Sequence, residues 1–248
     1  MRKLFMLALG LALAATAWGA ADSFVRGSVV LDFVLPQMEM PRANDWAKNI
    51  DFTELVAHHE GELGTIKPGF GYGLGYGVSL GPYFRFDASV STIKSEHKAT
   101  FTGVDPDTNV QYNRGLTFTT HIVPMRFDGT FVAPGFFNDR FKPEFGLGVV
   151  TYIVRYNTDQ TRTTTPPGEP ADVRTGQAWA RDVCFGPEAK AGLGITLFDG
   201  FTVEAALTYS TAEATFDQWT RYSDIPLNGP GSEDFTGWAV WVGPRYYF

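Results

Sequence analysis

The strongest pattern along this chain is an alternation of apolar residues with small or polar ones, which is typical of β-strands with one apolar face. Its clearest example is segment 238–248, where apolar residues occupy every second position up to Phe248. The opposite face of this segment carries small, aromatic and charged residues, among them Arg245. The pattern predicts a strand whose Phe248 lies on the apolar, lipid-facing side.

The same alternation recurs in seven earlier segments. They are 25–35, 66–80, 83–90, 116–131, 144–153, 188–197 and 201–209. No apolar run of about 20 residues, the length of a membrane-spanning helix, occurs beyond the first two dozen positions. Barrel strands are only half apolar and therefore escape such a scan. The chain is thus expected to be all-β: an eight-stranded antiparallel up-and-down transmembrane β-barrel.

One segment breaks the alternation. Its apolar residues change parity along the strand: Leu116, Phe118 and Ile122 are even-numbered, whereas Met125, Phe127 and Phe131 are odd-numbered. A β-bulge within 119–124 would insert one residue and so reverse the faces. Alternatively, the first part of the strand stands above the membrane. The sequence leaves the register of 116–124 open between these two explanations.

The predicted connections alternate between short and long, as in bacterial barrels with short periplasmic turns and long extracellular loops. The short turns are 79–82, 133–140 and 198–200, and the long loops are 36–65, 103–114, 158–176 and 212–234. A short helix is expected at 45–58, with Asn44 or Asp45 as its N-cap. Aromatic residues near strand ends suggest two interfacial belts, with Tyr156, Trp179 and Trp219 on the long-loop side.

Charged residues of the predicted strands fall on the face opposite the apolar one. There are five basic and six acidic groups: Arg26, Asp32, Arg85, Asp87, Arg126, Asp128, Glu144, Glu188, Lys190, Glu204 and Arg245. A charge facing lipid at mid-depth costs ~2–4 kcal/mol, and eight strands leave an interior just wide enough for side chains to fill. We therefore expect a lumen filled by ion pairs, with a gated polar path as the alternative. Glycines alternating through 69–77 would either make room for neighbouring side chains or leave a hollow for a ligand.

The first residues have the features of an export signal. Arg2 and Lys3 precede an apolar stretch and then small residues, so that cleavage is expected after Gly19 or Ala21. We take 1–21 as the signal peptide and 22–248 as the barrel domain. Loss of Arg2 and Lys3 would change the net charge from −7 to −9, which argues against nucleic-acid binding. The single cysteine, Cys184, can form no internal disulfide and is expected to be buried.

These features together resemble the small eight-stranded outer-membrane barrels, the superfamily of the OmpA membrane domain, OmpX and OmpW. The resemblance rests on the signal peptide, on strand–turn–strand units such as RFKPEFGLGVVTYIV and EAKAGLGITLFDGFTVEAALTYS, and on the terminal RYYF. It implies location in the outer membrane, contact with its lipid and lipopolysaccharide, and transient binding to the barrel assembly machinery through Tyr246 and Phe248. Oligomeric state stays open.

Catalytic and metal-binding chemistry is weakly represented. His58 and His59 lie in an acidic loop without the spacing that places ligands on one rigid face, so no metal or other cofactor is expected. His121 has no serine near it in its strand, and the His-x-Ser-Asn signature of lipid A deacylases is missing, so an enzyme is not expected. The favoured function is a structural or surface-interaction barrel. The alternative is a narrow conduit for small solutes, supported only by the inward Val30, Val34, Val150 and Val154, and a lipid-modifying enzyme ranks third.

Overall fold

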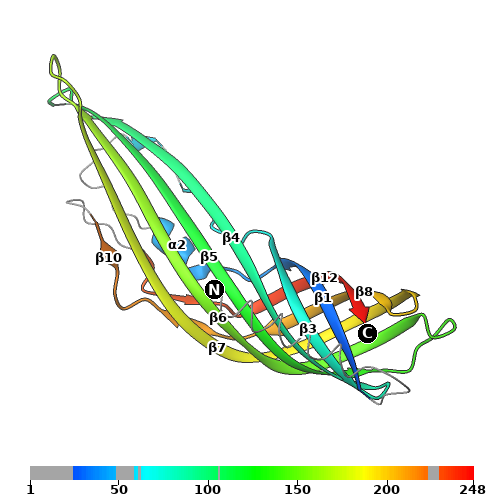
Figure 1. Ribbon diagram of the computed structural model, residues 1–248. Coiled ribbons are helices and arrows are strands. Elements are labelled where there is room, and N and C mark those ends of the chain that lie inside the picture. Colours follow the sequence, from blue (N-terminus) through cyan, green and yellow to red (C-terminus); the bar gives the residue numbers. More distant parts are fainter. Residues whose placement is uncertain (1–24, 49–58, 61–62, 106, 223–228) are drawn as a thin grey trace.

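The computed structural model confirms an antiparallel up-and-down barrel of eight strands (Figure 1). It describes residues 25–48, 59–60, 63–105, 107–222 and 229–248, so the predicted signal peptide lies outside the described residues. The barrel strands are β1 (Val25–Pro36), β3 (Gly71–Leu80), β4 (Phe84–Val104), β5 (Gln111–Val132), β6 (Phe141–Thr165), β7 (Asp172–Phe198), β8 (Phe201–Ser210) and β12 (Gly237–Tyr247). Each strand pairs with the next along the chain, and β12 closes the barrel by pairing with both β1 and β8. No described helix is both long and apolar enough to cross a bilayer.

The strands differ greatly in length. Those from β4 to β7 contain 21 to 27 residues, whereas β1, β3, β8 and β12 contain 10 to 12. The long strands continue past the closed barrel as a curved four-stranded sheet (Figure 1). We call this sheet the extension; it comprises 93–104, 111–122, 154–165 and 172–182.

Two predicted loops are therefore wrong. Half of 103–114 and most of 158–176 are strand, and the chain turns between Val104 and Gln111 and between Thr165 and Asp172. The turn-forming residues of 166–170 predict a loop, but the preceding run Thr161–Thr165 is rich in threonine, which is β-branched and favours extended backbone. Polar residues can still pair as neighbouring strands, because the hydrogen bonds of a ladder join backbone groups. Thr163, for example, lies opposite Asn113.

The parity change in β5 needs no bulge. The β5–β6 ladder runs without a shift from Gln111 to Val132, and even-numbered β5 residues face inward along its whole length. Phe118 is therefore fully buried inside the extension, whereas Phe127 is 51% exposed on the outside of the barrel. The apolar residues change faces because the inner face is buried in the extension, whereas the outer face is apolar on the barrel. The second explanation for 116–124 therefore holds: the first part of the strand stands above the apolar zone.

An uncharged outer surface surrounds the closed part of the barrel. Among the described residues, no outward position carries a charge in β1, β3, β8 and β12, or in 84–92, 123–131, 141–153 and 183–197 of the long strands. We call this surface the apolar belt. On β6 it spans 12 residue steps, from Phe141 to Ile153; these are about 40 Å of strand, or about 28 Å of height at a 45° tilt. This height matches the apolar core of a membrane.

The concave side of the extension is covered by two segments from different loops. One is α2 (Pro41–Lys48); the other is the pair β9 (Glu213–Thr215) and β11 (Ser232–Asp234). We call them the cap. Phe118 contacts Trp46 of α2 and Tyr156, with ring centroids 4.9 and 5.2 Å apart. Tyr156 contacts Phe216 in turn at 4.6 Å, so a layer of aromatic rings joins cap and extension.

The cap corrects several predicted details. The helix expected at 45–58 begins earlier, at Pro41, whose fixed φ suits the first helical position; 49–58 lie outside the described residues. Asn44 is not an N-cap but ties the helix to Ile66, accepting the Ile66 amide at 2.6 Å. Tyr156 is buried beneath the cap and Trp219 packs on Ala178, so neither belongs to an interfacial belt. Two short strands, β2 (His59–Glu60) and β10 (Thr220–Arg221), pair with the edges of β4 and β7.

Candidate functional site: the barrel lumen

The lumen gathers most of the charged residues predicted to face inward. Ten of the eleven are buried inside the barrel, from Asp32 on β1 to Arg245 on β12. The exception is Arg26, which is exposed. Its inward register is as expected, but it is the second residue of β1 and so lies at the rim, where the barrel opens to water.

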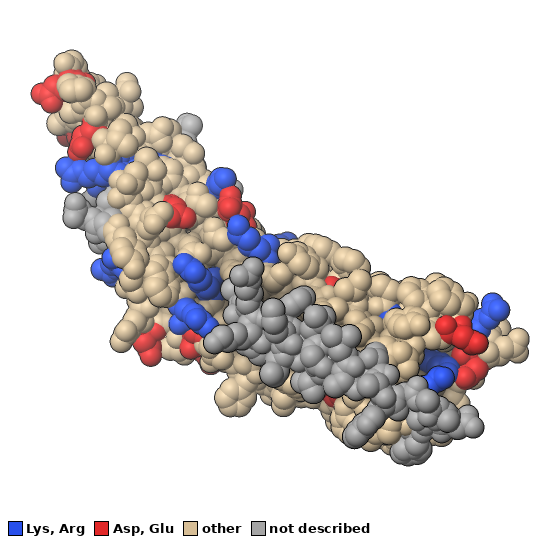
Figure 2. Space-filling view, viewed as in Figure 1, with Lys and Arg blue, Asp and Glu red and all other residues tan. Residues whose placement is uncertain are grey.

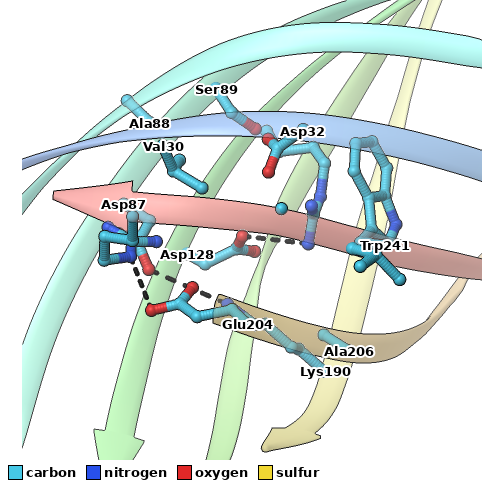
Figure 3. A pocket seen from close by; sticks show the side chains of 14 residues that line it. Val30, Asp32, Asp87, Ala88, Ser89, Asp128, Lys190, Glu204, Ala206 and Trp241 are labelled. Carbon is cyan, nitrogen blue, oxygen red and sulfur yellow. Dashed lines mark hydrogen bonds and ion pairs between the residues drawn. The ribbon is translucent and has the colours of Figure 1, made fainter. Parts of the chain in front are cut away.

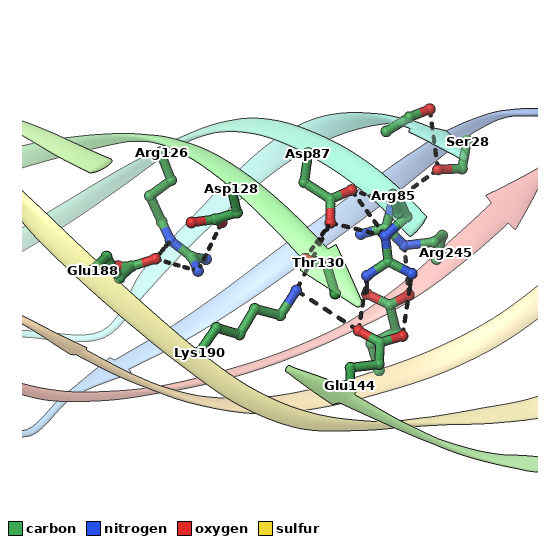
Figure 4. Close-up of polar contacts among 12 residues, drawn as sticks. Ser28, Arg85, Asp87, Arg126, Asp128, Thr130, Glu144, Glu188, Lys190 and Arg245 are labelled. Atoms are coloured by element: carbon green, nitrogen blue, oxygen red, sulfur yellow. Dashed lines mark hydrogen bonds and ion pairs between the residues drawn. The ribbon is translucent and has the colours of Figure 1, made fainter. Parts of the chain in front are cut away.

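Six of these groups form a charge-balanced cluster near the short-turn end (Figure 4). We call it the lower cluster; it contains Arg85, Lys190 and Arg245 with Asp87, Glu144 and Glu204. Three positive groups thus face three negative ones, supplied by β4, β6, β7, β8 and β12. Because the partners come from different strands, the cluster joins opposite walls of the barrel.

Arg85 is the centre of the lower cluster. Its guanidinium is 2.8 Å from Asp87, 2.8 Å from Glu144 and 2.9 Å from Glu204, and it also donates to the Tyr247 hydroxyl at 2.9 Å. The residue is only 1% exposed. A planar guanidinium with five donors can satisfy several acceptors at once, which a lysine ammonium cannot do in this geometry.

A second group of charges lies deeper toward the extension. We call it the upper cluster; it consists of Arg126, Asp128, Glu188 and the nearby Asp32. Arg126 is 2.6 Å from Glu188 and 3.2 Å from Asp128, and its guanidinium lies 4.0 Å from the ring centroid of Trp241. One cation therefore faces three carboxyl groups, so that the lumen as a whole has four basic and six acidic groups.

Small residues on β3 make room for this network. A Cβ on Gly77 would collide with Asp87 Oδ1 and Arg245 Nη1, and one on Gly75 would lie 2.7 Å from Val30. Of the two roles that the sequence allowed for these glycines, the packing one holds. A cavity of about 30 Å³ remains between the two clusters (Figure 3), which is far below the ~300 Å³ at which small-molecule pockets begin.

Above the clusters the lumen turns apolar. Val34, Val150 and Val154 are each fully buried and belong to the same core as the cap. Tyr152 bridges this zone, because its hydroxyl lies 2.7 Å from Ser210 and its ring stacks on Phe235 of the cap. Three of the four inward valines that support a conduit therefore pack against other side chains, and the fourth, Val30, lines the cavity of about 30 Å³.

Glu233 on β11 holds the cap together. Its carboxylate accepts the backbone amides of Arg42 at 3.2 Å and Ala43 at 2.8 Å, two of the unpaired donors in the first turn of α2. Glu233 is fully buried, and this burial raises its pKa to about 7 despite the amides that stabilise the charge. Sequence analysis missed Glu233, because it lies in a turn-rich loop and its partner is 190 positions away along the chain.

The remaining predicted residues lie outside the two charged clusters. Tyr246 is 54% exposed on the outer surface, and the Phe248 ring lies 6.4 Å from that of Tyr76 on the same side. Cys184 is buried in the apolar core that the barrel shares with the cap. His121 faces outward and its Nε2 lies 2.8 Å from the Thr92 hydroxyl. Within the described residues no group of histidine, cysteine and acidic side chains could hold a metal ion; His58 is outside them.

Comparison with solved structures gives small outer-membrane barrels, the kind of protein that the sequence resembles. The N-terminal β-barrel domain of OprF from Pseudomonas aeruginosa matches at 12% identity and a TM-score of 0.38, covering 90% of this chain and 97% of that one. OprG from the same organism matches at 12% identity and 0.41, covering 90% and 96%. Ail of Yersinia pestis, in complex with a heparin analogue, matches at 10% and 0.36, covering 90% and 99%. No protein-family model and no curated protein sequence matches.

Proposed function

We propose that this chain is an integral outer-membrane protein with a structural role, whose lumen is closed to solutes. The observation that carries the proposal is the double closure: a charge network in the middle of the barrel and an apolar cap above it. The apolar belt supports membrane insertion, because its outward side chains are uncharged over about the thickness of a bilayer core. The long strands would then project outward from the cell as the extension.

The network supports a closed lumen by its packing. Arg85 and Arg245 are at most 2% exposed, and the cavity between the clusters is about 30 Å³. An ion crossing the barrel would have to separate ion pairs in a low-dielectric interior, where their mutual attraction is strong. The cap adds a second barrier, since the packed aromatic layer of Trp46, Phe118 and Tyr156 stands in the path of a hydrated ion.

Planar-bilayer recording tests this proposal. The purified protein should give no conductance steps above those of detergent alone, and proteoliposomes should take up a small apolar solute no faster than protein-free vesicles. A porin measured in parallel shows that the assay detects a channel. The variant Phe118→Ala, which loosens the cap, should also stay silent because the lower and upper clusters remain. Steps or solute uptake by the unaltered protein would favour the narrow conduit.

A further inference from the structure

A row of basic residues crosses the outer face of the sheet at the upper edge of the apolar belt. Lys94 pairs with His121, His121 with Arg155, and Arg155 with Arg181. We call these four residues the basic row. They lie directly beside one another on four adjacent strands, so they span about 15 Å at the usual strand spacing. Figure 2 shows blue side chains gathered on the visible face near the middle of the molecule.

The basic row borders the apolar belt directly. The next outward row toward the barrel is Thr92, Val123, Ile153 and Val183, and the one after it contains Met125 and Phe185. Phe185 is 80% exposed and Val183 is 51% exposed, as expected of side chains that face lipid. Lys94, Arg155 and Arg181 therefore lie at the depth where acyl chains end and lipid headgroups begin.

The basic groups of the row have no ion-pair partner among the described residues. Lys94 and Arg181 are exposed, and neither forms an ion pair with any described residue. Glu96, the nearest carboxylate along β4, forms its ion pair with Lys98 at 2.7 Å and only a weaker electrostatic contact with Lys94. Asp182 faces inward and accepts the Thr215 amide. Arg155 and Arg181 lie directly opposite each other, and like charges in that position destabilise a sheet, so a bound anion would offset their repulsion.

One member of the row is held in place. The Arg155 guanidinium lies 5.3 Å from the ring centroid of Trp179 and donates to Asn157 Oδ1 at 3.0 Å. Asn157 and Trp179 form part of the outward row just above, so an aromatic ring and an amide lie beside the cations. Tryptophan is favoured at headgroup depth, and arginine can bind a phosphate through two parallel hydrogen bonds.

We propose that the basic row binds the phosphate groups of a phosphorylated glycolipid in the outer leaflet. A headgroup with phosphates at both ends of a sugar scaffold can contact both Lys94 and Arg181, while its acyl chains lie on the apolar belt below. Asn157 and Trp179 then face its sugars. This inference rests on the proposed outer-membrane function and identifies the lipid class that the barrel holds.

Native mass spectrometry of the folded protein in a zwitterionic detergent tests the proposal, with diphosphoryl lipid A as the probe and its dephosphorylated form as the comparison. The test variant is Lys94→Gln/Arg155→Gln/Arg181→Gln. The control variant, Lys48→Gln/Lys98→Gln/Arg174→Gln, removes the same charge from exposed positions away from the belt. The unaltered protein and the control should bind the diphosphoryl lipid at least about tenfold more tightly than the dephosphorylated one, since charge-assisted contacts are lost.

The test variant should lose that preference while still shifting on boiling in detergent gels. Equal preference in the test variant and the control would overturn the proposal. Competition by inorganic phosphate or glucosamine 6-phosphate at the concentration at which the lipid binds would show that the row takes soluble anions, which also overturns it. Failure of the unaltered chain to insert into bilayers would instead refute the proposed function, and the lipid site with it.

Discussion

Replacing Arg85 with methionine should destabilise the folded barrel by ~3–5 kcal/mol, because it removes one partner from a buried ion network. Arg85 contacts three carboxylates within 2.9 Å and is 1% exposed. The lower cluster would change from three positive and three negative groups to two and three. One carboxylate then stays buried without a counter-charge, and this costs more than the lost contacts themselves.

Urea unfolding in phosphocholine vesicles measures this cost, with the folded fraction followed by the gel shift and by tryptophan fluorescence. Arg26→Met is the matched control, since Arg26 is exposed at the rim and its loss should change stability by no more than ~0.5 kcal/mol. Adding Glu144→Gln to Arg85→Met restores the charge balance and should recover ~0.5–3 kcal/mol through their coupling. If Arg85→Met unfolds like the control, the lumen is hydrated and the argument for a sealed barrel fails.

Three further changes test other parts of the structure. Gly77→Ala should destabilise the barrel because its Cβ displaces Asp87 and Arg245 from the lower cluster, whereas Gly115→Ala, with open space around it, should be as stable as the unaltered protein in the same urea unfolding assay. The raised pKa of Glu233 means that it contributes stability below its unfolded value of about 4.5 and loses it as pH rises through about 7. Amides of α2 should therefore exchange faster at pH 8 than at pH 5 after correction for intrinsic exchange, and Glu233→Gln should remove this difference. Leu147→Arg should cost ~2–4 kcal/mol in vesicles, whereas Thr161→Arg on the extension should cost almost nothing; equal costs would mean that the belt does not face lipid.

The alternation of apolar and polar residues was enough to predict the barrel strands, because each strand has a period of two and one apolar face. The eight strands and the inward side of Arg85, Arg126 and Glu204 follow from that period. Local composition predicted too long a loop at 158–176, because the turn-forming residues there are confined to its middle and 161–165 continue the strand. The same period also fails to predict strand ends, since polar threonines continue a ladder as well as apolar residues do.

The sequence by itself determined where the chain is apolar outside and charged inside, because alternation is a local property of neighbouring residues. Only the tertiary structure decided that Arg85 meets Asp87, Glu144 and Glu204, since barrel closure brings these side chains together. It likewise decided that Glu233 caps a helix 190 residues earlier. The alignment of Lys94 with Arg155 and Arg181 depends on the register of three separate ladders. Register is set by packing across strands and by hairpin length, and no single segment carries that information.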